Sequence, residues 1–240
     1  MRPRREGSRA PVPYADGMTD STAPMRGQVF LDALGAEAER LHPEILAQYR
    51  APVAAGHAEG VFAVAGSRFG SWTALAHPIV GPGLLVPTRG SDVPFVLRTT
   101  SGRSTTGRAT LDSTREFLFP GHTARIVDRL TVSVRPGLVR NLLGARGRVE
   151  LIEECSVTDE GFLRMRTVRV ALRLFGRRFA LRGLLGVRVD LVDGWDPEHR
   201  RRTIDMRAVN AVLGTVLEYR GWYRESEPAT AEGREPGQKR

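Results

Sequence analysis

The sequence predicts a mainly β fold (α+β), arranged as a curved antiparallel sheet or incomplete barrel with N-terminal helices packed on it. Nine segments alternate apolar and polar residues, the period that sends successive side chains to opposite faces of a strand. Short turn signals such as Pro120-Gly121 and Pro136-Gly137 separate most of them. Short links favour antiparallel pairing, because a parallel crossover needs a dozen or more residues. A helix-grip arrangement, a long sheet wrapped around a helix, is the alternative.

Two helices are predicted before the strands. Apolar residues of the first recur at spacings of three and four, as one face of a helix requires: Val29, Phe30, Ala33, Leu34, Ala38 and Leu41. The second begins at Pro43, because proline is tolerated in the first turn of a helix. Its buried side consists of Ile45, Leu46 and Tyr49. Both helices are therefore amphipathic and can pack on the sheet.

The predicted strands cover most of the remaining chain. Their ranges are 61–65, 93–98, 115–119, 124–134, 148–157, 162–174, 187–192, 203–209 and 215–223. Residues 138–143 interrupt the alternation and predict a short connecting helix that plugs the end of the sheet, with a lid or membrane-touching element as the alternative. Asp193-Gly194 predicts a turn, followed by a long loop to Arg202.

The segment from Gly161 to Arg188 holds eight arginines, no lysine and no acid. Its alternation predicts a strand with an apolar face and a cationic face; Val168, Val170, Leu172 and Leu174 alternate with Arg169, Ala171 and Arg173. Arginine binds anions well. However, the net charge of +9 and the single lysine, Lys239, accompany an excess of alanine, glycine and proline, which favours a GC-rich genome over an anionic partner. No strong nucleic-acid signal is present.

Composition divides the chain into three parts. Residues 1–26 and 225–240 lack periodic apolar positions and predict a disordered leader and tail, with Met18 and Met25 as alternative starts. Residues 27–224 predict one β-rich domain. No stretch approaches the roughly 18 apolar residues of a membrane span, and the leader lacks the apolar core of a signal peptide. A cytoplasmic protein without a transmembrane segment is expected.

The sequence contains no metal or cofactor motif that we recognise. The five histidines are scattered, without the spacing of zinc ligands, so no metal is predicted. There is no serine-nucleophile elbow and no glycine-rich phosphate loop, so no cofactor is predicted either. Cys155 lies among strand residues and is expected to pack as a small apolar group. These absences lean towards a protein that is not an enzyme.

Glu150, Glu153 and Glu154 form the densest group of carboxylates. Alternation places Glu150 and Glu154 on one face of a strand and Glu153 on the other, with Leu151 and Cys155. Two carboxylates can divide acid and base work when their surroundings separate their pKa values. Alternatively, Glu150 and Glu154 pair with arginines on a neighbouring strand, as opposite charges across a sheet commonly do.

The sheet and the missing catalytic motifs predict a non-catalytic binding or accessory module with an apolar pocket for a small or lipid-like ligand. Arg169 and Arg173 are candidates for an anionic head group, and Tyr219 or Trp222 for a pocket wall. An enzyme of unknown reaction, using Glu150, Glu153 or Glu154 with an arginine, is the second hypothesis. Binding of nucleic acid or an anionic surface through the arginine face is the third.

A series of motifs resembles the bacterial domain-of-unknown-function family 4166. These are Leu41-His42-Pro43, Val93-Pro94-Phe95-Val96, Leu143-Gly144, Arg148-Val149-Glu150-Leu151 and the segment from Leu213 to Gly221. The likeness spans Leu41 to Trp222. It implies no established activity and no catalytic residue. Family members resemble stand-alone proteins or additions to saccharopine-dehydrogenase-like modules, which implies a separate nicotinamide-dependent partner, since these 240 residues hold no such module.

Overall fold

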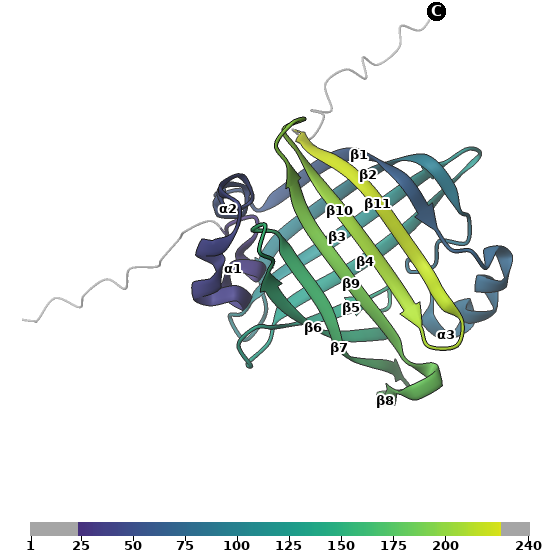
Figure 1. The fold of residues 1–240 in the computed structure, drawn as a ribbon. Helices are drawn as coiled ribbons and strands as arrows, with labels where there is room; N and C mark the ends of the chain where they lie inside the picture. The colour runs from purple at the N-terminus through teal and green to yellow at the C-terminus, as the bar shows by residue number, and fades with distance from the viewer. Residues whose placement is uncertain (1–23, 227–240) are drawn as a thin grey trace, which may run out of the picture.

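The computed structural model describes residues 24–226 (Figure 1). The predicted leader and tail therefore lie almost entirely outside the described residues. The strands are β1 (Ala55–Gly66), β2 (Gly90–Arg103), β3 (Ala109–Phe119), β4 (His122–Val132), β5 (Leu138–Leu143), β6 (Val149–Val157), β7 (Leu163–Leu174), β8 (Arg177–Leu181), β9 (Val187–Asp196), β10 (Arg201–Asn210) and β11 (Gly214–Ser226).

Ten of these strands close into an antiparallel barrel. The hydrogen-bonded order is β6-β5-β4-β3-β2-β1-β11-β10-β9-β7-β8, and β6 also pairs with β7. That last pairing joins the two ends of the sheet, so the predicted open sheet or incomplete barrel is wrong, although the mainly β class is confirmed. The helix-grip alternative is also wrong, because the longest described α-helix has 8 residues. Closure satisfies the strand edges that an open sheet would expose.

Two local predictions are corrected by the barrel. Residues 138–143 form β5 rather than a connecting helix, and both edges of β5 pair, with β4 and with β6. Asp193-Gly194 lies inside β9 rather than in a turn, and the long loop shrinks to residues 197–200. Tertiary pairing overrides the weak local preference in both segments.

A β-bulge changes the faces of β7 halfway along its length. Opposite β6, Ile152 pairs with Arg169 but the next residue, Glu153, pairs with Thr167, which leaves Val168 as the extra residue. Val168 is 59% exposed, whereas Val170 is 6% exposed. The predicted regular alternation from Val168 to Leu174 is therefore wrong at its first residue, because Val168 and Arg169 both face outward.

Helices cover both ends of the barrel (Figure 1). One end carries α1 (Gln28–Leu34), the 3-10 helix η1 (Gly35–Arg40) and α2 (Pro43–Arg50), which agree with the two predicted helices. The other end carries the 3-10 helix η2 (Gly70–Ala76) and α3 (His77–Val80), which the sequence analysis did not predict, and a third 3-10 helix, η3 (Gly183–Leu185), links β8 to β9. Apolar side chains of α1, η1 and α2 pack on the inner faces of β3 to β7, and a cluster of aromatic rings lines β1, β2, β3 and β11.

Candidate ligand-binding cavity

The barrel encloses a cavity of about 740 Å³. Each strand of the barrel directs alternate residues inward, and most of the residues that line the cavity are apolar. Contributors include Leu151 of β6, Met165 of β7, Leu191 of β9 and Met206 of β10. Segments at the α3 end, among them Leu84 from the β1–β2 connection, complete the wall. Cavities of this size and character hold drug-sized molecules in other proteins.

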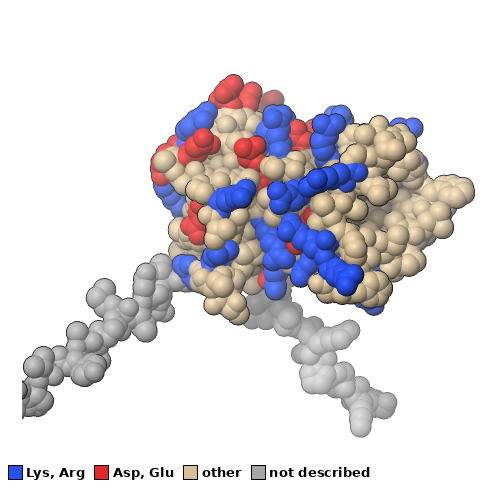
Figure 2. Space-filling model, turned by 90° about the horizontal axis from the view of Figure 1, so that it is seen from below, with Lys and Arg blue, Asp and Glu red and all other residues tan. Residues whose placement is uncertain are grey.

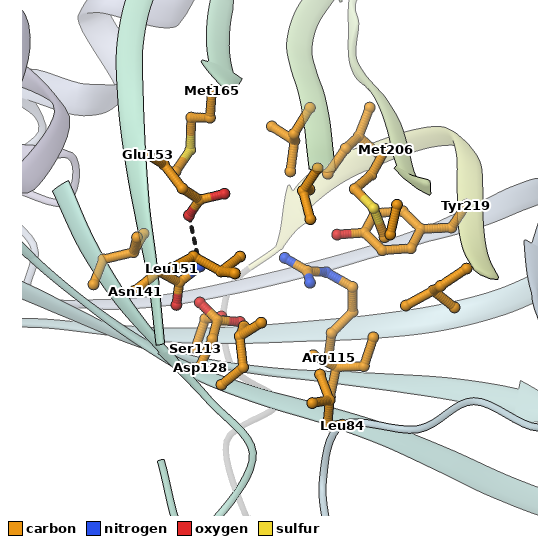
Figure 3. Close-up of a pocket in the computed structure, with 18 of the residues that line it drawn as sticks. Leu84, Ser113, Arg115, Asp128, Asn141, Leu151, Glu153, Met165, Met206 and Tyr219 are labelled. Atoms are coloured by element: carbon orange, nitrogen blue, oxygen red, sulfur yellow. Dashed lines mark hydrogen bonds between the residues drawn. The ribbon is translucent and has the colours of Figure 1, made fainter. Parts of the chain in front are cut away.

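A group of polar side chains interrupts the apolar wall (Figure 3). Neighbouring strands β3 to β6 and the more distant β11 supply Ser113, Arg115, Asp128, Asn141, Glu153 and Tyr219. Figure 3 shows the Arg115 guanidinium and the Tyr219 hydroxyl directed into the space that Asp128 and Glu153 border from the other side. We refer to these six residues as the inner polar cluster.

Hydrogen bonds inside the inner polar cluster satisfy some of its atoms and leave others open. The Ser113 hydroxyl donates to Oδ1 of Asp128 at 2.5 Å. The Asn141 amide Nδ2 donates to Oε2 of Glu153 at 2.9 Å. Within the described residues, Asn141 Oδ1 and Arg115 Nε are buried and have no hydrogen-bond partner. Because unpaired buried polar atoms are costly, these two atoms mark where a ligand could bind.

Arg115 is a charged donor without a carboxylate partner among the described residues. Its guanidinium carbon lies 5.1 Å from the centre of the Tyr219 ring, a cation–π distance. Burial acts to lower the pKa of Arg115, but Tyr219, Asp128, Tyr223 and Asp193 act in the opposite direction, and the pKa is raised overall. The side chain therefore remains a cation inside an apolar cavity.

The two carboxyl groups of the cluster are shifted towards their neutral forms. Burial raises the pKa of Glu153 to about 7, against the opposing effect of the Asn141 hydrogen bond and with help from Asp128. Burial also raises the pKa of Asp128, although Arg115 and Ser113 act in the opposite direction. Near neutral pH, Glu153 is consequently able both to donate and to accept a proton.

A second polar network lines the cavity at the helical end. Arg202 of β10 is 2% exposed and donates to Asp193 Oδ2 at 2.6 Å and to Gln48 of α2 at 2.7 Å. Tyr223 donates to Asp193 Oδ1 at 2.9 Å, and Tyr49 to Oδ2 at 3.3 Å. The network connects α2 to the barrel. Both oxygens of the Asp193 carboxylate and both terminal nitrogens of Arg202 have hydrogen-bond partners in it.

The four predicted ligand contacts separate into two environments. Tyr219 is 3% exposed and lines the cavity. Arg169 and Arg173 are exposed on the outer face of β7. Trp222 stacks outside the barrel against Arg201, whose guanidinium carbon lies 4.7 Å from the ring centre. The structure thus brings Tyr219 to the inner polar cluster and places the other three elsewhere.

The three predicted carboxylates also separate. Glu150 faces outward under three arginines from three strands, Arg140 at 3.1 Å, Arg173 at 3.8 Å and Arg178 at 2.5 Å. This is the cross-strand pairing that the sequence analysis gave as an alternative to catalysis. Glu154 is exposed, and Glu153 alone of the three lies in the cavity.

The sequence analysis missed Ser113, Arg115, Asp128 and Asn141. Alternation already carried the signal, because Arg115 shares a face with Phe117 and Phe119, and Asp128 shares one with Ile126 and Leu130. A charged residue in the apolar register of a strand is unusual and marks an interior polar position. Asn141 could not be found in this way, since its segment was predicted as a helix.

Among residues 24–226, no helix is both long enough and apolar enough to cross a membrane. Comparison with known proteins matches residues 41–223 to the family described as domain of unknown function (DUF4166). No curated protein and no solved structure matches the chain. The family match confirms the resemblance seen in the motifs between Leu41 and Trp222. Since it covers more than half of the chain, the protein belongs to the DUF4166 family.

Proposed function

We propose that the protein is a binding module whose barrel interior holds an elongated, mostly apolar molecule with one polar end. The observation that carries the proposal is Arg115, a cation aimed into an apolar cavity without a carboxylate partner among residues 24–226. The volume of about 740 Å³ fits a small or lipid-like molecule. A few convergent polar groups in an apolar wall are typical of small-molecule sites.

The inner polar cluster favours a particular kind of polar end. Arg115 offers N–H donors and therefore needs an acceptor, while the free Oδ1 of Asn141 needs a donor. A protonated carboxyl group meets both needs, because its carbonyl oxygen accepts from the guanidinium and its hydroxyl donates to Asn141, whereas the ionised form meets the need of Arg115 alone. Charge-assisted hydrogen bonds of this kind are roughly twice as strong as neutral ones. A long-chain carboxylic acid is therefore the ligand class we expect.

Binding of cis-parinaric acid, a fluorescent long-chain carboxylic acid, tests the proposal. We expect saturable binding to the wild-type protein and about 10- to 100-fold weaker binding to R115M, the loss of one charge-assisted interaction. R115K keeps the charge but not the planar fork and should fall between them. R169M, which changes an outward arginine of β7, should bind like the wild type.

The matching long-chain alcohol, used as a competitor, checks the role of charge. It should compete equally well against wild type and R115M, because it lacks the carboxylate that Arg115 recognises. Thermal unfolding confirms that each variant is folded. Equal affinity of wild type and R115M for the acid, or an empty wild-type protein by native mass spectrometry after purification from its own host, would overturn the proposal.

A second function, proton transfer on the bound molecule, is favoured by one observation. Glu153 combines burial in the cavity with a pKa raised to about 7, which is the property of a general acid or base. Glu150 and Glu154 face away and cannot share this role. Mass spectrometry of the ligand recovered from the same binding experiment distinguishes conversion from simple binding.

A further inference from the structure

The barrel end that carries α3 exposes a concentration of large apolar side chains. We define the mouth as the connections at this end, residues 67–89, 120–121, 144–148, 175–186 and 211–213. Its exposed large apolar side chains are 47% to 97% exposed: Trp72, Leu75, Ile79, Phe175, Phe179, Leu184, Leu185, Val212 and Leu213. Isolated exposed apolar residues are ordinary, but a gathering of them marks an interaction surface.

Hydrogen bonds join some of these connections in pairs. The Asn210 amide donates to the Leu184 carbonyl at 2.8 Å, which joins η3 to the β10–β11 turn. Arg148 donates to the Pro78 carbonyl at 2.8 Å, which joins α3 to the start of β6. In Figure 1, α3, β8 and the β10–β11 turn lie at the same end, opposite α1 and α2.

The cavity reaches the surface at the mouth. Trp72 and Leu213 line the cavity and are also 73% and 55% exposed. Leu181 of β8 and Val187 at the start of β9 line the wall just inside. An apolar molecule could therefore pass between the cavity and whatever covers the mouth.

Charge is distributed unequally between the two ends of the barrel. The connections of the mouth contain no aspartate or glutamate, but they contain Arg68, Arg89, Arg146, Arg148, Arg177, Arg178 and Arg182. The opposite end carries acids in its helices and turns, namely Asp32, Glu37, Glu39, Glu44, Asp159, Glu160 and Glu198. Figure 2 shows basic side chains gathered in a band beside a largely uncharged region on the side of α3.

We infer that the mouth docks onto the surface of an anionic lipid membrane. Exposed tryptophan and leucine side chains enter the boundary between head groups and acyl chains, and arginines such as Arg177 and Arg182, which form no salt bridge within residues 24–226, pair with anionic head groups. Docking in this orientation would let an apolar ligand enter the cavity without crossing water. The inference goes beyond the proposed function, because it rests on the outer surface and not on the inner polar cluster.

Charge and shape favour a membrane over other occupants. A second copy of the chain would bring two sets of mouth arginines together, and like charges repel. A nucleic acid would gain from the arginines and could stack on Trp72, Phe175 and Phe179, but the exposed leucine, isoleucine and valine side chains, which are the majority, offer no stacking surface for bases. A membrane with anionic lipid uses both the apolar and the cationic groups.

Cosedimentation with vesicles tests the inference. We expect wild-type protein to bind phosphatidylcholine vesicles containing 30% phosphatidylglycerol at least about tenfold more tightly than pure phosphatidylcholine vesicles. Binding should weaken as salt is raised. R177E/R182E should reduce binding to the anionic vesicles by at least about tenfold. R108E/R135E makes the same change in net charge at exposed sites of the opposite end and should leave binding within about twofold.

The apolar contribution is tested separately. L184S/L185S should weaken vesicle binding, whereas V134S, at an exposed valine of the opposite end, should not. Trp72 fluorescence, followed in W195F/W222F protein, should shift to the blue on binding. Each variant is also tested with cis-parinaric acid in solution, so failure of docking and failure of the cavity site are distinguishable.

Several outcomes would overturn the inference. The first is equal affinity for neutral and anionic vesicles, and the second is an equal loss of vesicle binding in R177E/R182E and R108E/R135E. The third is a protein that sedimentation without vesicles shows to be self-associated through the mouth. Stronger binding to single-stranded DNA than to anionic vesicles, lost in R177E/R182E, would replace the membrane by a nucleic acid and would also overturn it.

Discussion

Glu153 shows how the surroundings of one side chain can set the pH dependence of the whole protein. Its pKa is raised from 4.5 to about 7 by burial, so between these values the folded state holds a proton that the unfolded state has released. The free energy of unfolding therefore falls as pH rises through this window, by about 3 kcal/mol in total, and is level above it. Full stability from this group is present below about pH 4.5.

The variant E153Q should lose most of this dependence. Glutamine keeps an acceptor for Asn141 but cannot ionise, so its unfolding free energy should change less between pH 5 and pH 8 than that of the wild type. Asp128, whose pKa is also raised, leaves a remaining slope of the same sign. Urea denaturation at several pH values measures both curves. Parallel curves would show that Glu153 ionises as freely in the folded protein as in the unfolded chain.

At the scale of residues, sequence alternation predicts which face of a strand a side chain lies on, but it does not predict which residues that side chain contacts. It placed Glu150 and Glu153 on opposite faces of their strand, and in the structure Glu153 lies in the cavity while Glu150 faces outward. It could not reveal that the Arg115 guanidinium carbon lies 5.1 Å from the centre of the Tyr219 ring, because the two residues are more than a hundred positions apart in the sequence. Such proximity depends on the closure of the sheet, which local periodicity does not encode.

Among the elements, β1 and β11 approach each other unusually closely at two glycines. A Cβ on Gly221 would lie 2.1 Å from the Val61 carbonyl oxygen, and one on Gly60 would lie 2.0 Å from that of Trp222. The clashing atoms are backbone, so neither strand can yield by rotating a side chain. Gly221 belongs to the C-terminal motif that carries the family resemblance, and this contact explains why a glycine is needed there.

The variant G221A should lower the unfolding free energy by about 2 kcal/mol or more, as overpacking against a backbone does. G102A is the matched control, because a Cβ on Gly102 of β2 meets only the Thr110 hydroxyl at 3.3 Å. Its effect should stay below about 1 kcal/mol. Chemical denaturation of the two variants gives the comparison, and equal losses would mean that the strands move apart at little cost.

Elements with a clear local signal were predictable, and those that depend on their neighbours were not. The strand from 148 to 157 agrees with β6 to within one residue. β5 is short and its apolar residues also fit a helical turn, so only pairing with β4 and β6 makes it a strand. Asp193-Gly194 has the composition of a turn, yet its aspartate is held in β9 by Tyr223 and Arg202.

For the whole molecule, the pairing of β7 with β9 is the shortest part of the ring. Only residues 163–166 of β7 pair with β9, whereas β9 pairs with β10 over residues 187–196. Beyond this seam β7 turns to pair with β8, and the side chain of Thr167 accepts a hydrogen bond from the Val189 amide at 3.0 Å. The seam is where the barrel is expected to open most readily.

Hydrogen exchange should reveal this opening. Amides of residues 187–191 should exchange faster than those of residues 203–209 in β10, which pair on both sides. T167V removes the bridging acceptor and should accelerate exchange in the first segment without changing the second. Mass spectrometry of the two peptides measures both. Uniform protection across them would show a barrel that opens only by global unfolding.

The bulge at Val168 has a consequence for how such a cavity could diversify. In a strand of regular pleat, Arg169 and Arg173 would take the inward positions that Val170 and Leu172 occupy. The extra residue therefore determines whether apolar or cationic side chains face the cavity along this stretch of β7. If the bulge closed and the rest of β7 slid one position along β6, the two faces would exchange without any substitution, and this stretch of wall would change from apolar to cationic.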